Sequence, residues 1–382
     1  YMLTLNSKLL IDYIDNKLYP KHSKKSKKKS HKKSNTVSLY KEYRDLYKFF
    51  NSINTHHVVN GIKQSRNESY SSMKVDSPFI SNNINEEIQT LNNYYSFELR
   101  THKSVINVNI YYSDEDLTEF LRVIKIAISF IFNISKHNVL NCTINYYLSG
   151  AEKKMDCDKD YSIHEFSQKE INSGSCNPGK GIINIWRKEE ILKVTLHECI
   201  HLLEYDHTNE DYLLKELYKK KYNVSSSSMN IFEAYTEIWA ELMNCYLVNK
   251  LMNGNQHTFV KFLEYEKYFS HYQAAKIFHI KSLKEKVIDL NKYTNVLPYY
   301  IIKCEIFNNL REFLNHCRNK NNNIDYVKIK DNFKEFLDGL EVCKKDTKLF
   351  TNINKKCYRY ITMRMSCLEY KLFRHEYKHH PC

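Results

Sequence analysis

His197, Glu198 and His201 have the spacing His-Glu-x-x-His within KVTLHECIHLLEYDH, residues 193–207. On a helix, residues four apart lie on one face about a turn apart, so both imidazoles can reach the same ion. Zinc binds imidazole nitrogens at roughly 2.0–2.1 Å, and a catalytic site uses three protein ligands and one open position. Glu198 would lie beside that position as a general base toward water. The pattern therefore predicts a catalytic Zn2+ site.

The surroundings of this motif are apolar, which favours a buried site over chance. Burying two histidines and a glutamate without partners costs free energy, so core histidines with ordinary hydrogen bonds are the weaker interpretation. A second match, HEYKH at residues 375–379, has no apolar face and is interpreted as coincidence. The apolar positions around the first motif are Ile191, Leu192, Val194, Leu196, Ile200, Leu202 and Leu203.

The third ligand has two possible sources, and the first is His207. It stands at the last position of the longer pattern HExxHxxGxxH, in which a glycine allows a sharp turn out of the helix. Here Glu204 occupies the glycine position and favours a continuing helix. A continuing helix would carry His207 about 9 Å beyond His201, too far to share an ion. His207 is therefore predicted to be an exposed residue near the helix end.

The second source is the later stretch FEAYTEIWAE, residues 232–241, with Glu233, Glu237 and Glu241 four residues apart. Carboxylates on so apolar a helix suggest that at least one points inward. Two ordinary explanations compete. The glutamates could form a solvated acidic stripe, which suits Glu241 best, or Asn230 could cap the helix with Glu233 as its capping-box partner. The apolar side is formed by Tyr235, Ile238, Trp239, Leu242 and Tyr246.

HECIH followed by the EAYTE helix resembles the gluzincin class of zinc metallopeptidases, whose third ligand is a glutamate on a following helix. By similarity to the thermolysin-like pattern, Glu233 would be the ligand and Glu237 would hold a ligand histidine. A second frame resembles gluzincins with an E-x-x-A-E helix, and it makes Glu237 the ligand and Glu241 the partner. We favour the first frame and keep the second open.

The resemblance covers about residues 102–250. Strands are predicted at 104–112, 142–148 and 182–186, with a helix after the first strand and the motif helix directly after the third. This order is similar to the N-terminal subdomain of zincins. In that likeness IINIW, residues 182–186, would be the edge strand, to which an extended peptide could add by β-pairing.

The resemblance also implies a tyrosine or histidine in the later subdomain that stabilises the oxyanion. The candidates are Tyr299 and Tyr300 in NVLPYYIIK, with His271 and His279 behind them. The expected fold is α+β and zincin-like, with a small mixed sheet and the active-site helix in an N-terminal subdomain. The expected segments are an N-terminal helix (1–20), a flexible Lys-rich segment (21–34), a helical region (35–100), the zincin N-terminal subdomain (101–207) and a mainly helical C-terminal subdomain carrying the glutamate helix (208–382).

The net charge of +14 over 382 residues is uneven, because KHSKKSKKKSHKKS at residues 21–34 holds eight lysines and no acid. Such a block is expected to be solvated, as a linker, a nuclear signal or a weak nucleic-acid contact. No apolar run is long enough to span a bilayer, and the 11 scattered cysteines favour free thiols. The expected location is intracellular: the cytoplasm, with the nucleus or a virion as alternatives.

Three functions remain in competition. The first is a zinc-dependent peptidase acting on a peptide or protein, with Glu198 as general base. The second is a non-catalytic binding module on a zincin fold, which the presence of Glu198 disfavours because a structural site does not need that carboxylate. The third is a nucleic-acid-associated protein that acts through residues 21–34.

Overall fold

The computed structural model describes most of the chain. The Lys-rich segment 21–34, His207 and the second motif copy at 375–379 lie outside the described residues. The described residues are 2–18, 40–70, 72–101, 104–134, 141–155, 166–206, 212–223, 229–282, 291–320, 326–328, 333–340 and 362–374.

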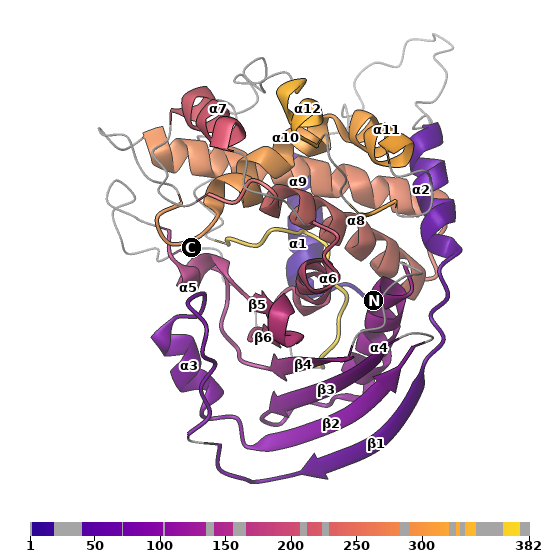
Figure 1. Cartoon of the computed structure of the whole chain (residues 1–382), viewed down its shortest axis with the longest axis vertical. Coiled ribbons are helices and arrows are strands. Elements are labelled where there is room, and N and C mark those ends of the chain that lie inside the picture. Colours follow the sequence, from indigo (N-terminus) through magenta and orange to yellow (C-terminus); the bar gives the residue numbers. More distant parts are fainter. Residues whose placement is uncertain are drawn as a thin grey trace.

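A six-stranded mixed sheet forms one side of the molecule, in the order β1-β2-β3-β4-β6-β5 (Figure 1). β3 pairs in parallel with β4, and β4 with β6, while the other three neighbouring pairs are antiparallel. Ile106 of β3 is in register with Leu99 of β2 and Cys142 of β4, and all three side chains are buried. The strands are β1 (Val58–Ser65), β2 (Asn93–Arg100), β3 (Val105–Tyr112), β4 (Asn141–Tyr147), β5 (Gly174–Asn177) and β6 (Ile182–Ile185).

Two strands were missing from the sequence prediction, which made residues 35–100 helical. That region contains α2 (Lys41–Asn51) and α3 (Asn82–Ile88), but also β1 and β2, so the helical prediction is wrong for half of its elements. β1 is exposed along most of its length. It therefore lacks the alternation of apolar and polar residues by which a half-buried strand is detected.

The strand pattern predicted after residue 101 is present, with one correction at the sheet edge. β3, β4 and β6 fall where strands were expected, and α4 (Thr118–Phe132) connects β3 to β4. The predicted edge strand, 182–186, is instead an interior strand, because β5 pairs with its outer side. Four residues that include a glycine and an asparagine carry little strand signal, so the sequence does not predict β5. Between these strands lie α5 (Gln168–Ile171) and η2 (Pro178–Lys180).

The chain after residue 208 is mainly helical, as predicted, and the fold is α+β. α6 (Ile191–Leu202) lies between the sheet and the later helices, in contact with α4, β5 and α8 (Figure 1). α9 packs on α8 in turn, and one continuous core runs from the sheet through these helices. The remaining helices are α1 (Leu5–Tyr13), η1 (Ile14–Leu18), α7 (Tyr212–Tyr222), α8 (Glu233–Leu251), α9 (Gln256–Ser282), η3 (Leu297–Ile302), α10 (Lys303–Asn308), α11 (Leu310–Lys320) and α12 (Phe333–Asp338).

Residues 362–374 cross the middle of the molecule and are held by buried carboxylates (yellow in Figure 1). Glu190, at the start of α6, accepts hydrogen bonds from the backbone N–H groups of Met365 at 2.9 Å and Ser366 at 2.6 Å. Its other oxygen lies 2.9 Å from the Lys153 ammonium. This late segment is thereby attached to the beginning of the motif helix.

The structure also bears on the expected lack of a membrane span and on the expected free thiols, as far as the described residues go. None of their helices combines the length and the apolar character needed to cross a membrane. Their cysteines, among them Cys142, Cys199 and Cys245, are all unpaired thiols.

We predict that Glu190→Gln lowers the free energy of unfolding by about 3 kcal/mol at pH 7, because it breaks a buried ion pair. Burial raises the pKa of Glu190, but the Lys153 ammonium and other nearby cations bring it down to about 2, below the ordinary 4.5. Glu190 therefore contributes stability above pH 4.5 that is lost as the pH falls toward 2. The difference between wild type and variant should narrow over that range in urea titrations.

Glu98→Gln is the matched control, because Glu98 pairs with Arg100 at 2.6 Å on the exposed side of β2. A surface pair contributes about 1 kcal/mol or less. Equal losses in the two variants would contradict the structural role assigned to Glu190.

Candidate metal centre

The motif helix α6 ends in a tight turn just after His201, and this turn determines which side chain contacts His201. The backbone N–H of Tyr205 donates to Ile200 O at 3.1 Å, and that of Glu204 donates to His201 O at 3.0 Å. With Glu204 at φ 52°, these bonds form a Schellman motif in which a glutamate adopts the left-handed conformation. The prediction that Glu204 continues the helix is wrong. The turn brings Asp206 back to His201, whereas His207 lies outside the described residues.

Three ligand-type atoms meet at one point beside α6. The Nε2 atoms of His197 and His201 are 3.1 Å apart, and Glu233 Oε2 lies 3.4 Å from each of them. Three atoms bound tetrahedrally to one zinc ion at 2.0–2.1 Å would be about 3.3 Å apart. The triangle therefore already has the size that a tetrahedral zinc site needs, and these residues form the only such cluster of His, Cys, Asp and Glu found among the described residues.

Each histidine is oriented by a carboxylate on its other nitrogen. His197 Nδ1 lies 2.9 Å from Glu237 Oε2, and His201 Nδ1 lies 2.5 Å from Asp206 Oδ2. Thr236 of α8 donates to the same Asp206 oxygen at 2.9 Å. When Nδ1 donates to a carboxylate, Nε2 presents its lone pair. Both lone pairs then face Glu233 Oε2, which is buried without a hydrogen-bond partner in the described part of the chain.

The local charges favour a cation at this point. Burial lowers the pKa of His201, but the carboxylates of Glu233 and Asp206 more than offset it and leave that pKa well above its ordinary value. Burial also raises the pKa of Glu233, yet the two histidines bring it far below the ordinary range. Positive charge between these side chains is stabilised, whether a proton or a metal ion supplies it. By donor type, spacing and charge, the residues fit a divalent metal ion.

The glutamates of α8 take three different roles. Glu233 faces the histidines and does not join a capping box, since Asn230 Oδ1 accepts from Phe232 N and no side chain caps the helix. Glu237 is not placed as a ligand, because one of its oxygens binds His197 and the other lies 2.5 Å from Lys193 Nζ. This arrangement does not support the frame with Glu237 as metal ligand.

Glu241 is not part of a solvated stripe. Its side chain is fully buried and lies 2.8 Å from Lys303 Nζ. Glu241 was expected to contact solvent, but it forms a buried ion pair with Lys303 instead. The geometry agrees with the frame in which Glu233 approaches the two imidazole Nε2 atoms and Glu237 holds a histidine.

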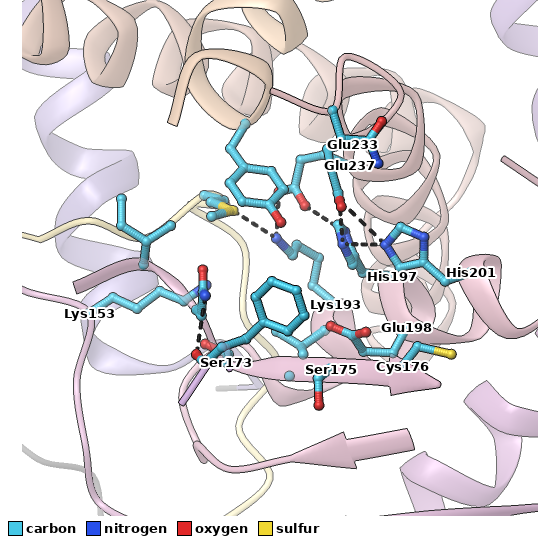
Figure 2. Close-up of a pocket in the computed structure, with 18 of the residues that line it drawn as sticks. Lys153, Ser173, Ser175, Cys176, Lys193, His197, Glu198, His201, Glu233 and Glu237 are labelled. Atoms are coloured by element: carbon cyan, nitrogen blue, oxygen red, sulfur yellow. Dashed lines mark hydrogen bonds and ion pairs between the residues drawn. The ribbon is translucent and has the colours of Figure 1, made fainter. Parts of the chain in front are cut away.

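Glu198 lies between α6 and the edge strand β5 (Figure 2). A Cβ atom at Gly174 would come within 2.6 Å of Glu198 Oε1, so the carboxylate occupies the space that a side chain would fill. Glu198 is buried, and burial raises its pKa above the ordinary value. His197, His201 and Glu233 are called the triad below. A carboxylate of raised basicity beside this triad has the properties of a general base.

Only one of the two candidate tyrosines faces the site. The Tyr299 ring centroid lies 6.0 Å from that of His197, and burial together with Glu233 and Glu198 raises its phenol pKa well above 10. Tyr300 does not line the pocket: it is buried and its hydroxyl donates to Met363 O at 2.5 Å, so this arrangement does not support its predicted catalytic role. His271 is also turned away, with Nε2 2.5 Å from Asn308 Oδ1. The side chain of His279 lies outside the described residues.

A pocket of about 230 Å³ opens beside the triad. Its walls come from the edge strand β5, helices α6 and α8, η3 and the segment 362–374 (Figure 2). Ser173, Ser175 and Cys176 line it from the β5 side, and Lys153 and Lys193 line it as well. A substrate in this pocket would lie against the triad, Glu198 and Tyr299 together.

Sequence reasoning missed Asp206, Lys193 and Gly174. Asp206 lies just after the motif, but its role depends on the left-handed turn at Glu204. A glutamate gives no sequence signal for such a turn. Lys193 carries a weak signal, since it is a lone lysine one turn before His197 on an apolar helix.

We compared the chain with models of protein families, with curated proteins and with solved structures, and it matches none of them significantly. The function must therefore be inferred from the site itself.

We expect purified protein to bind one zinc ion per chain, as measured by elemental analysis. His197→Ala, His201→Ala and Glu233→Gln should lose it, because each removes one corner of the triangle. Glu237→Gln should keep a site whose zinc affinity is roughly 10–100-fold weaker, since it alters only the orientation of His197. His257→Ala, on the exposed start of α9, is the control. Full zinc retention in Glu233→Gln would exclude Glu233 as a ligand.

Proposed function

We propose that this protein is a zinc-dependent peptidase of the gluzincin type, with His197, His201 and Glu233 as zinc ligands. The observation that carries the proposal is the triangle of 3.1, 3.4 and 3.4 Å formed by two Nε2 atoms and one carboxylate oxygen. The order of parallel strands and the motif helix after them supports a zincin-like fold. Bound zinc would supply a polarised water molecule and a Lewis acid for the peptide carbonyl.

Glu198 is the general base in this proposal. It would accept the proton from the attacking water and deliver it to the leaving amine, two steps that suit a buried carboxylate of raised pKa. Because Gly174 has no side chain, the Glu198 carboxylate can lie directly against β5. A site that served only to hold the fold together would not need a base at this position.

Tyr299 is the proposed oxyanion donor. A phenol is protonated at neutral pH, and burial together with the neighbouring carboxylates raises the pKa of Tyr299 further. A protonated phenol can donate to the oxygen that gains negative charge in the transition state. We also propose that an extended peptide pairs with the edge strand β5, since a strand at the end of a sheet has backbone groups on one side that no other strand binds.

We expect Glu198→Gln to lower the hydrolysis rate of an unstructured protein such as casein by roughly 10²–10⁴-fold. Its zinc content should stay unchanged, because Glu198 is not a ligand in this scheme. An active Glu198→Gln variant would falsify the assignment of the base. If neither it nor the wild type hydrolyses any peptide although both bind zinc, the protein is a binding module.

Tyr299→Phe should lower kcat by roughly 10²–10³-fold through loss of one oxyanion donor. Tyr300→Phe is its matched control: it loses a buried hydrogen bond to Met363 O and therefore some thermal stability, but not kcat.

Gly174→Ala should lower kcat by about 10²-fold with zinc retained, because the new methyl group displaces the Glu198 carboxylate. Gly179→Ala is the control, since the nearest atom to a Cβ there is 3.7 Å away. The pair is compared by casein hydrolysis and elemental analysis. Equal activity of both variants would show that Glu198 tolerates displacement and would count against its role.

A further inference from the structure

Two buried ammonium groups line the pocket beside the triad. Lys153 Nζ lies 2.9 Å from Glu190 Oε2, and Lys193 Nζ lies 2.5 Å from Glu237 Oε1. Both side chains are 2% exposed. Figure 2 shows them in the same pocket as the His–Glu triad, with Lys193 directed toward Glu237.

Neither ammonium has enough acceptors. An ammonium has three N–H donors. Among the described residues, Lys153 has one oxygen acceptor, and Lys193 has one oxygen and the weakly accepting Met365 sulfur at 3.6 Å. Buried donors without acceptors cost free energy. The unused donors therefore call for further acceptor atoms.

A third polar group of the same pocket lacks a partner. Ser173, just before β5, is 4% exposed, and its Oγ has no hydrogen-bond partner in the described part of the chain. Lys153, Lys193 and Ser173 reach the pocket from three separate segments. Unsatisfied hydrogen-bonding groups on separate walls of one cavity are typical of a ligand site rather than of a local packing fault.

The chemistry of these groups selects the ligand. A cationic side chain would meet two ammonium groups, and an apolar one would leave their donors unsatisfied. A carboxylate has two oxygens that can accept several hydrogen bonds, and charge-assisted bonds are the stronger kind. The ammonium groups are close enough for Lys193 to lower the pKa of Lys153, which burial already lowers. A bound anion would relieve that repulsion.

We propose that this pocket binds a carboxylate of the peptide next to the scissile bond, with Lys153, Lys193 and Ser173 as donors. The inference rests on the proposed peptidase function and adds a substrate class to it. The carboxylate has two possible sources, an Asp or Glu side chain and the C-terminus of the peptide. Both share one chemistry, and the experiment separates them.

The test measures peptide binding to the zinc-loaded Glu198→Gln protein by fluorescence anisotropy, so that turnover is not required. The probes are labelled hexa-alanine peptides blocked at both ends, with Glu, Gln or Leu at each position in turn. At one position or more, the Glu peptide should bind roughly tenfold tighter or more than its Gln counterpart. A second set without acidic side chains compares a free with an amidated C-terminus. A gain in that set alone assigns the pocket to the C-terminal carboxylate.

Equal affinities for the Glu, Gln and C-terminal variants overturn the proposal, and so does a lack of binding by every peptide. A carboxylate preference in Glu198→Gln with no hydrolysis by the wild type would remove the peptidase function and leave the binding site. Hydrolysis by the wild type without a carboxylate preference would remove the proposed binding site and leave the peptidase function. These comparisons vary only the ligand and do not depend on the folding of a lysine variant.

Lysine variants then locate the contact. In the Glu198→Gln background, Lys153→Met and Lys193→Met should each reduce the preference for Glu over Gln. Because Lys153→Met leaves Glu190 without its cation, Lys153→Met with Glu190→Gln is measured beside it, and folding is checked by circular dichroism. Lys188→Met is the matched control, since Lys188 pairs with Glu115 at 2.6 Å outside the pocket. An unchanged preference in folded lysine variants would show that the carboxylate binds elsewhere.

Discussion

The Glu237 carboxylate, bound to two groups of α6 at once, is the interaction on which the geometry of the site depends. One oxygen lies 2.5 Å from Lys193 Nζ and the other 2.9 Å from His197 Nδ1. Lys193 and His197 are one turn apart on α6, so this carboxylate sets both the rotation and the axial position of α8. Glu233, one turn earlier on α8, is thereby carried to the two imidazoles. A shift of α8 by one residue would separate all of these atoms.

This contact belongs to a network of buried ion pairs that join distant parts of the chain. Lys303 pairs with Glu241 at 2.8 Å, and Glu190 binds both Lys153 and the segment 362–374. Buried charges are costly unless paired and hydrogen-bonded, so each pair restricts how two segments can meet. Because the pairs lie where α6, α8, α10 and the late segment adjoin, they hold the walls of the pocket in position. The same placement leaves Lys153 and Lys193 lining that pocket with fewer acceptors than donors.

The two histidines of the triad are held in unlike ways. Asp206, which orients His201, is a near neighbour on the chain and depends on the left-handed turn at Glu204. His197 depends on Glu237, a residue of α8 that lies forty positions later in the chain. The same pocket combines the three metal-type ligand atoms with the hydrogen-bond donors of Lys153, Lys193 and Ser173. In our proposals, a peptide carbonyl would face the first and a carboxylate of the same peptide the second.

The sequence by itself determined the elements whose signal is local. The four-residue spacing of His197 and His201 puts them on one helical face whatever surrounds the helix, and β3, β4, β6 and α8 have apolar patterns of their own. It could not determine β1, which is exposed along most of its length, or β5, which is only four residues long. Tertiary structure alone decided that Glu233 faces the histidines, that Asp206 turns back to His201, and that Tyr299 rather than its neighbour lines the pocket. Each of these depends on the rotation of one element against another, which is set by packing between residues far apart in the chain.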